Sequence, residues 1–302
     1  MSRILSFNEW TSASVNECVI AKFEVDGSSA LIKNRDRAYL APIEIVHEMI
    51  NGVEVAYLHD KITDWSEGIN EFGIGIVNSA LQVKEDEKEG EKAVKKKKSY
   101  TPEPAYDGPK IREALSKKTV KEAAKSVVEF TGTDPKEVGV KGETLVSDGK
   151  TTFLIELTSN TDTTIHEVPL DEFVVRTNHG IDNPNVGYTK GIKRESSVSR
   201  MELAKEQVSS VDSVEEAMDR LAERLTKDNA MNPYRDNPKA KMHTTAQIGY
   251  DLKNRILYVR YDEKFGKFEG ISTNLPIGYK PKIQMVVSPV TEEIKDGESE
   301  NK

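Results

Sequence analysis

The chain has 302 residues, of which 36% are hydrophobic and 31% are charged, and its net charge is −8 at pH 7. This length is enough for one large core or two modest ones, whereas the negative charge argues against broad nucleic-acid binding, which requires clustered cations. A single cysteine excludes an internal disulfide, and the five histidines show no spacing typical of metal ligands, so neither a metal nor another cofactor is expected.

Residues 1–17 are polar, with few large apolar side chains. They lack the apolar segment of a secretory signal, and no run in the chain approaches the ~20 apolar residues of a membrane span. We therefore expect a cytoplasmic protein that is not bound to a membrane. Two interpretations of residues 1–17 stay open, a frayed terminus or a leader that is removed.

Cys18, the only cysteine, opens a stretch that predicts a β-hairpin. Apolar residues 18–23 lead into a Gly-containing turn, and a second apolar run, 30–32, ends in a polar cluster. The members of this cluster are Lys33, Arg35 and Asp36. A lone buried cysteine is most often only a small hydrophobe, but this hairpin would bring the thiol within reach of a carboxylate and positive charges.

The next segments predict further strands and a long loop. Apolar and polar residues alternate over 39–63 around Asn51-Gly52, which is a strong hairpin signal. Residues 65–81 indicate a turn followed by a buried strand. Residues 84–98 are a mixed-charge run that continues into a Pro-bearing stretch, so we expect a mobile charged loop over 84–109.

The rest of the chain alternates between helices and strands. Residues 110–130 have helical spacing, strands follow between 152 and 177, and residues 196–227 predict two helices. A last hairpin occupies 246–261, and residues 291–302 predict a disordered charged tail. Clustered strands and clustered helices indicate an α+β fold built in layers, with mainly antiparallel sheets.

The thiol of Cys18 needs a base to become a thiolate at neutral pH. No histidine lies near Cys18 in the sequence. Its own α-amine, with a pKa of ~7.7–8.0, can accept the thiol proton if the chain is cut before Cys18. Removal of residues 1–17 would free this amine, which favours the leader interpretation.

With these features the chain resembles the N-terminal-nucleophile (Ntn) hydrolases of the choloylglycine hydrolase and penicillin V acylase type. It resembles most the acyl-CoA:6-aminopenicillanate acyltransferase-like branch. The resemblance extends from Cys18 to about Ile271 and rests on short motifs in the expected order. They are Cys18, Lys33-Asn34-Arg35-Asp36, Gly68-Ile69-Asn70-Glu71-Phe72-Gly73 with Asn78 after it, Arg176-Thr177-Asn178-His179, Ser196-Ser197-Val198-Ser199-Arg200, and a late hairpin over 248–259.

The resemblance implies a role for each matching residue. Cys18 would be the nucleophile exposed by cleavage, Asp36 would hold its α-amine, and Arg200 would lie near it. Asn78 and Asn178 would stabilise the oxyanion.

Three departures from the family pattern bear on these roles. Lys33 stands where the family has arginine, which keeps the charge but loses the planar fork, so Arg35 is a candidate to replace it as the auxiliary, substrate-facing cation. Glu17 precedes the nucleophile, where a small residue would ease self-cleavage. The 84–109 loop adjoins the strand of Asn78 and would remodel substrate entry. Three matched residues also have purely local alternatives, as turn residues or a surface cation: Asp36, Asn178 and Arg200.

The resemblance implies a four-layer αββα sandwich of two antiparallel sheets, with a leader over 1–17 and one Ntn-hydrolase domain over 18–290. The implied activity is that of an autocatalytically matured cysteine amidohydrolase or acyltransferase, which acts on a linear amide C–N bond through a Cys18 thioester. Its partner would be a small-molecule acyl amide, and assembly into a homo-oligomer stays open. The alternative from a different class is a non-catalytic Ntn-fold binding or structural protein that keeps its leader.

Overall fold

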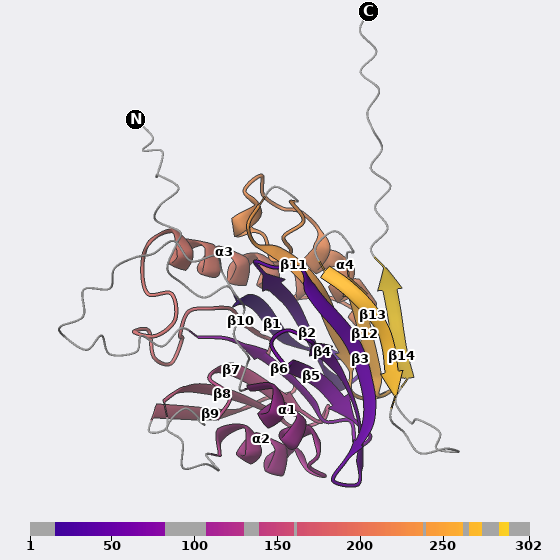
Figure 1. Ribbon diagram of the computed structural model, residues 1–302. Helices are drawn as coiled ribbons and strands as arrows, with labels where there is room; N and C mark the ends of the chain where they lie inside the picture. The colour runs from indigo at the N-terminus through magenta and orange to yellow at the C-terminus, as the bar shows by residue number, and fades with distance from the viewer. Residues whose placement is uncertain are drawn as a thin grey trace, which may run out of the picture.

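Two β-sheets packed face to face form the middle of the molecule, and helices cover both outer faces (Figure 1). The computed structural model describes residues 16–81, 107–129, 139–159, 162–237 and 240–261, together with the backbone of two further strands, 266–273 and 284–289. The predicted αββα sandwich is therefore confirmed by the order of the layers.

The six-stranded sheet has the strand order β10-β1-β2-β11-β12-β14. Its strands are β1 (Asn16–Val25), β2 (Ser28–Arg37), β10 (Val174–Arg176), β11 (His243–Asp251), β12 (Ile256–Tyr261) and β14 (Gln284–Pro289). Neighbours are antiparallel except for β14, which runs parallel to β12 at the edge. The predicted hairpins at the two ends of the chain are both confirmed, as β1–β2 and β11–β12.

The eight-stranded sheet has the order β13-β3-β4-β5-β6-β7-β8-β9. Its strands are β3 (Ala41–Ile50), β4 (Val53–Asp60), β5 (Trp65–Asn70), β6 (Gly75–Ser79), β7 (Gly142–Ser147), β8 (Thr152–Ser159), β9 (Asp162–Val168) and β13 (Gly266–Thr273). The edge strand β13 is parallel to β3, and the rest are antiparallel. Asn51 and Gly52 both have positive φ in the β3–β4 turn, as the predicted hairpin requires.

Two helix pairs lie outside the sheets. They are α1 (Asp107–Leu115) with α2 (Val120–Val128), and α3 (Gly191–Val208) with α4 (Val214–Ala222), and a short 3-10 helix, η2 (Asn229–Met231), follows. Residues 110–130, expected to be helical, therefore form two helices. Among the described residues, every helix falls short of the length or the apolar character that crossing a membrane requires.

Three hydrophobic clusters hold the four layers together. The first lies between the two sheets and includes Ile20, Leu58 and Tyr250. The second packs α1 and α2 on the eight-stranded sheet, and the third packs α3 and α4 on the six-stranded sheet. Because each sheet contributes side chains to two clusters, both of its faces are buried, and β1 and β2 contain almost no exposed side chain.

The three segments expected to lie outside the folded core are described only in part by the structure. The expected leader over 1–17 falls largely outside the described residues, but its last two residues belong to β1. Most of the expected loop over 84–109 also lies outside the described residues, although α1 already begins at Asp107, so the loop cannot extend to 109. The expected tail over 291–302 lies wholly outside them.

Gly68, the first residue of the Gly68–Gly73 motif, allows β4 and β5 to approach closely. A Cβ at Gly68 would lie 2.2 Å from the Ala56 carbonyl oxygen and 2.5 Å from the Tyr57 Cβ. In the same motif, the Asn70 side chain accepts two backbone N–H groups of the β5–β6 turn and donates to two carbonyls at the end of α1. The motif therefore shapes a turn and anchors a helix.

We expect Gly68→Ala to lower the free energy of unfolding by about 2–3 kcal/mol, because overpacking against backbone cannot be relieved by a rotamer change. Gly52→Ala is the matched control, since a Cβ at Gly52 meets nothing within 4 Å and only its positive φ has a cost, of about 1–2 kcal/mol. Urea denaturation of both variants measures the difference. Equal losses would show that β4 and β5 can separate freely at this point.

Candidate active site

The register of the β1–β2 hairpin sorts its polar side chains onto two faces. Cys18 pairs with Arg35, and Glu17 pairs with Asp36. Directly opposed residues of an antiparallel pair share a face, and neighbours along a strand alternate. The thiol therefore points toward the eight-stranded sheet, whereas the carboxylates of Glu17 and Asp36 point toward α3.

On the face between the sheets, three cations follow one another along β2 and lie against the ring of Trp65. The charged groups of Lys33, Arg35 and Arg37 lie 3.9, 4.8 and 5.4 Å from the ring centroid. Arg37 is the cation in contact with the Cys18 thiol, because its Nη1 lies 3.6 Å from the Sγ. Among the described residues, no carboxylate forms an ion pair with Arg37.

The other two cations have carboxylate partners. Lys33 forms a buried ion pair with Glu67 and donates to the Asn78 carbonyl oxygen at 2.6 Å. Arg35 pairs with Asp60 and donates to Thr245. The structure thus places Lys33 and Arg35 beside Cys18 in the sheet but with their charges already matched, and neither one offers a free cation to a substrate.

Burial shifts the ionisation of this region. Burial lowers the pKa of Lys33, although Cys18 and Glu67 oppose the shift. Burial also raises the pKa of Glu67 to about 7, against the pull of Lys33. For Arg37, burial favours the neutral form, but the neighbouring Cys18, Tyr39 and Asp60 raise its pKa above the usual range, so it stays charged beside the thiol.

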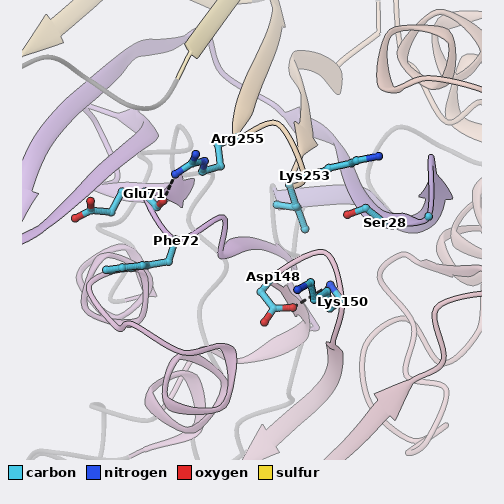
Figure 2. A pocket seen from close by; sticks show the side chains of 9 residues that line it. Ser28, Glu71, Phe72, Asp148, Lys150, Lys253 and Arg255 are labelled. Carbon is cyan, nitrogen blue, oxygen red and sulfur yellow. Dashed lines mark hydrogen bonds between the residues drawn. The ribbon is translucent and has the colours of Figure 1, made fainter.

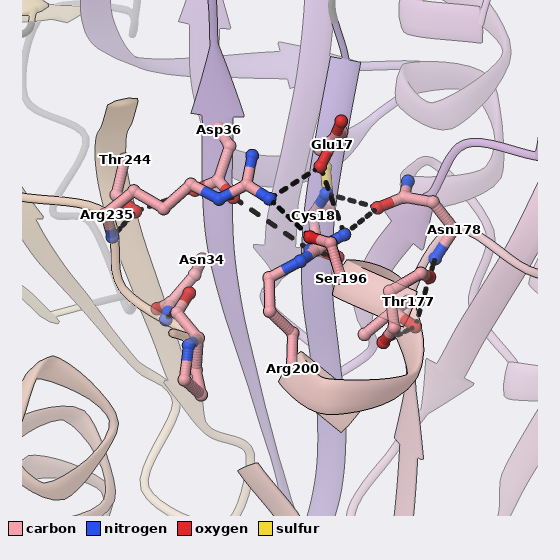
Figure 3. Close-up of polar contacts among 12 residues, drawn as sticks. Glu17, Cys18, Asn34, Asp36, Thr177, Asn178, Ser196, Arg200, Arg235 and Thr244 are labelled. Carbon is pink, nitrogen blue, oxygen red and sulfur yellow. Dashed lines mark hydrogen bonds and ion pairs between the residues drawn. The ribbon is translucent and has the colours of Figure 1, made fainter. Parts of the chain in front are cut away.

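On the face toward α3, the Glu17 carboxylate binds three donors, two of which, Arg200 and Arg235, are shown in Figure 3. It lies 2.7 Å from Arg235 Nη2 and 3.2 Å from Arg200 Nη2, and Tyr188 donates its hydroxyl at 3.0 Å. Asp36 completes the cluster, at 3.5 Å from Arg235 Nε and 4.0 Å from Arg200 Nη1. All five side chains are buried.

Two opposing effects act on the carboxylates of this cluster. Burial alone would raise the pKa of Glu17, but Arg235 and Arg200 lower it below the usual value. For Asp36 burial prevails and the pKa is raised, although the same arginines and a hydrogen bond from Thr244 oppose this. The arginines therefore hold Glu17 as a carboxylate inside the protein.

The backbone of Cys18 is held from the β10 side of the sheet. Its N–H donates to Asn178 Oδ1 at 3.0 Å, and its carbonyl oxygen accepts from Arg200 Nη1 at 2.8 Å. Arg200 Nη2 also donates to Asn178 Oδ1 at 3.0 Å. Cys18, Asn178 and Arg200 thus form one connected hydrogen-bond network.

Asn178 is fixed by residues on both sides of the six-stranded sheet. Its N–H donates to Ser197 Oγ on α3, and its Nδ2 donates to Ser79 Oγ at the end of β6 and to the carbonyl of Ala80, the next residue. Ser197 stands one helical turn before Arg200, so the S-x-x-R motif supplies both the support of Asn178 and the arginine. His179 bonds Ser197 rather than Cys18, and burial lowers its pKa to about 4.

Asn78 forms no hydrogen bond with Cys18. Its N–H donates to Glu67 and its Nδ2 donates to Thr144 Oγ1 at 2.8 Å. Its carbonyl oxygen accepts from Lys33. The oxyanion role expected for Asn78 stays a prediction.

Sequence reasoning missed three residues of the site. Arg37 could have been found, because it follows Lys33 and Arg35 at the two-residue period that places side chains on one face of a strand. No local sequence pattern points to Arg235 or Tyr188. They reach Glu17 from the segment after η2 and from the loop before α3, and only the folded chain brings them together.

The hollow in Figure 2 lies at the other end of the sandwich from Cys18. It has a volume of about 520 Å³ and is lined by turn residues: Gly27, Ser28, Glu71, Phe72, Asp148, Lys150, Leu252, Lys253 and Arg255. β1 runs from Cys18 to this end, which separates the two by roughly 25 Å. In the described ranges, no three His, Cys, Asp or Glu side chains gather as ligands for a metal ion.

Comparison with known proteins gives one family match. Residues 111–264 match the family described as acyl-coenzyme A:6-aminopenicillanic acid acyl-transferase. This segment is just over half of the chain and contains Asn178 and Arg200, but it begins after Cys18. No curated protein matches the sequence. Among solved structures, penicillin V acylase from Agrobacterium tumefaciens is similar, with 9% identity and a TM-score of 0.43 over 90% of this chain and 100% of that one.

The Arg35–Asp60 pair makes the fold sensitive to acid. Burial opposes ionisation of Asp60, but Arg35 and hydrogen bonds from Tyr39 and the Ile62 N–H lower its pKa to about 2, well below the usual range of an aspartate. A lowered carboxylate pKa contributes stability above the unfolded-state pKa, and this stability is lost as the pH falls through the folded-state pKa. The contribution at neutral pH is about 2 kcal/mol.

We therefore expect Asp60→Asn to be less stable than the wild type at pH 7 and to lose less further stability between pH 4 and pH 2. Urea denaturation at several pH values measures both effects. Asp212→Asn, which changes an exposed carboxylate, is the control and should keep the wild-type pH profile. An Asp60→Asn profile parallel to that of the wild type would contradict the assignment.

Proposed function

Because the chain belongs to the acyl-coenzyme A:6-aminopenicillanic acid acyl-transferase family, whose members are Ntn enzymes, we propose that it is a cysteine amidohydrolase or acyltransferase. It acts at a carbon–nitrogen amide bond through a thioester on Cys18. One observation carries this proposal. The sole cysteine has a guanidinium at its thiol, an asparagine at its nitrogen and an arginine at its carbonyl oxygen.

The first reaction would be cleavage of the chain's own Glu17–Cys18 peptide bond. The Cys18 Sγ attacks the Glu17 carbonyl carbon, a C–S bond forms and the C–N bond breaks. The thiol proton goes to the departing nitrogen, which becomes the α-amine of Cys18. Water then hydrolyses the thioester, and residues 1–17 leave as a leader with a new carboxyl group at Glu17.

The mature enzyme would repeat this chemistry on a substrate. The α-amine takes the thiol proton and returns it to the leaving amine. It occupies the position of the Cys18 N–H, which donates a hydrogen bond to Asn178 in the intact chain. Water or an amine acceptor then resolves the thioester. Asn178 and Asn78 are the proposed oxyanion donors, and removing one such donor costs on the order of 3 kcal/mol of transition-state stabilisation.

Arg200 and Asp36 would act by positioning. Arg200 ties the Cys18 carbonyl to Asn178, which supports a role in orienting the new N-terminus. Asp36 lies opposite Glu17, where it can receive the ammonium form of the α-amine once Glu17 has left. Lys33 and Arg35 would maintain the buried charge pairs behind the thiol.

The alternative is a non-catalytic member of the family that keeps residues 1–17 attached. The arrangement of Glu17 favours it, because the intact chain satisfies this buried carboxylate with three donors that cleavage would leave behind. The mass of the purified protein separates the two functions.

We expect intact-mass spectrometry of the wild type to show a chain that begins at Cys18, because the thiol and the carbonyl that it attacks are adjacent. Cys18→Ala should stay full length, since it lacks the nucleophile. Arg112→Met, which changes a partly buried cation that bonds Asp64 and Ser66 rather than Cys18, is the control and should mature. A wild-type chain that still carries Met1–Glu17 after long incubation would favour the non-catalytic alternative.

We expect Asn178→Ala to slow maturation and to lower kcat by about 10²–10³ through loss of the oxyanion donor. The same change removes buried hydrogen bonds, so stability should also fall by about 1–3 kcal/mol. Asn70→Ala is the matched control, because Asn70 is equally buried and makes four hydrogen bonds away from Cys18. An Asn178→Ala enzyme that loses stability like Asn70→Ala but keeps its kcat would make Asn178 a structural residue.

A further inference from the structure

The site that holds the Glu17 carboxylate is assembled from parts of the chain that remain after the leader leaves. Arg200 lies on α3, Arg235 lies between η2 and β11, and Tyr188 lies between β10 and α3. Their side chains are only 0%, 3% and 4% exposed, respectively. Donors that are buried this deeply are held by their surroundings, so the site would persist once Glu17 is gone.

Departure of Glu17 would leave this site with unmatched positive charge. In the intact chain, the two arginines face two carboxylates, Glu17 and Asp36. Afterwards, Asp36 alone faces both arginines, and at least one buried cation lacks an anionic partner. An unpaired buried charge is costly, so the emptied site would favour a new carboxylate.

We propose that the site of Arg200, Arg235 and Tyr188 is the acyl-binding site of the mature enzyme. It selects acyl groups in which three carbon atoms separate the reacting carbonyl from a carboxylate. Amides of an α-glutamyl or glutaryl group have this structure. The inference rests on the proposed function, because it requires that Cys18 be freed and react with amides.

The chemistry of maturation supports a shared site. The thioester formed during maturation joins the Glu17 acyl group to the Cys18 Sγ. An α-glutamyl amide would form the same kind of thioester on the same sulfur atom. When the amide becomes the thioester, the Glu17 carbonyl carbon exchanges its bond to the Cys18 nitrogen for a bond to the Sγ of the same residue, so it moves only a short way. The three-carbon arm of Glu17 is flexible enough for its carboxylate to remain between the arginines during this step.

The site would discriminate by charge and by length. A glutaminyl group has the same shape but no charge, and it would leave at least one buried arginine without an anionic partner. The hydrogen bonds to a charged group that a glutamyl carboxylate gains are worth roughly 30- to 100-fold in kcat/KM. An aspartyl group is one carbon shorter and would not reach both arginines while its carbonyl lies at Cys18.

The first experiment changes only the leader. Glu17→Gln and Glu17→Asp are expressed as full chains, and the appearance of the Cys18 N-terminus is followed by mass spectrometry. We expect both variants to mature at least about tenfold more slowly than the wild type, with Glu17→Gln the slower. Because residue 17 leaves with the leader, the matured variants have the same sequence as the matured wild type. Their activities should therefore agree.

The second experiment measures kcat/KM of the matured wild type on α-glutamyl and α-glutaminyl amides of 7-amino-4-methylcoumarin. We expect a preference of about 30- to 100-fold for the glutamyl amide. Tyr188→Phe keeps the ring but loses the hydroxyl that bonds Glu17, and it should reduce this preference about five- to tenfold. Tyr250→Phe is the matched control, since the Tyr250 hydroxyl is buried and forms no hydrogen bond to the described residues.

The outcomes separate the inference from the proposed function. A protein that matures and cleaves both amides equally well, or cleaves neither, overturns the acyl-site inference while the cysteine chemistry of maturation stands. Glu17→Gln maturing at the wild-type rate also overturns it. A wild type that neither matures nor forms a thioester with any amide overturns the proposed function, and the inference with it.

Discussion

The buried cluster of Glu17, Asp36, Arg200 and Arg235 is the interaction on which the rest of the site depends. Removing an ion from water costs several kcal/mol, and here four ionisable groups are buried together. The arrangement is tolerable because each arginine lies near both carboxylates. It also fixes geometry, because the cluster joins β1, β2, α3 and the segment before β11 at the point where the chain passes from Glu17 to Cys18.

The alternation of a β-strand keeps this cluster apart from the thiol. Glu17 and Asp36 project toward α3, and Cys18 projects between the sheets. The charged groups nearest to Sγ are therefore cations, with Arg37 in contact, and reactive cysteines are found in such electropositive surroundings. A shift of one residue in the β1–β2 register would bring the carboxylates to the thiol face. The ten-residue pairing of the hairpin, buried on both faces, resists such a shift.

Much of this arrangement follows from local sequence patterns. The hairpin of Cys18, the turn at Asn51-Gly52 and the layered order of strands and helices could be predicted, because turn residues and hydrophobic periodicity act over short distances. The motif order also located Asn178 and Arg200, which do meet at Cys18. The partners of the charges could not be predicted. Lys33 and Arg35 are neutralised by Glu67 and Asp60 from the opposite sheet, and Arg235 reaches Glu17 across more than 200 residues of chain, so only tertiary packing decides these pairs.

Glu17, the residue before Cys18, shows best how packing changes the meaning of a sequence. From the sequence, Glu17 looked unfavourable for self-cleavage, because a small residue gives the peptide more freedom. In the fold, the peptide is instead anchored on both sides, by the Glu17 carboxylate and by the nitrogen and carbonyl oxygen of Cys18. Fixed placement of reacting groups can contribute as much to a rate as flexibility. The same anchor has a cost after cleavage, because the leader would then end in two carboxylates beside two arginines. If residues 1–17 are a leader, its release, rather than the breaking of the peptide bond, would be the step that this cluster slows.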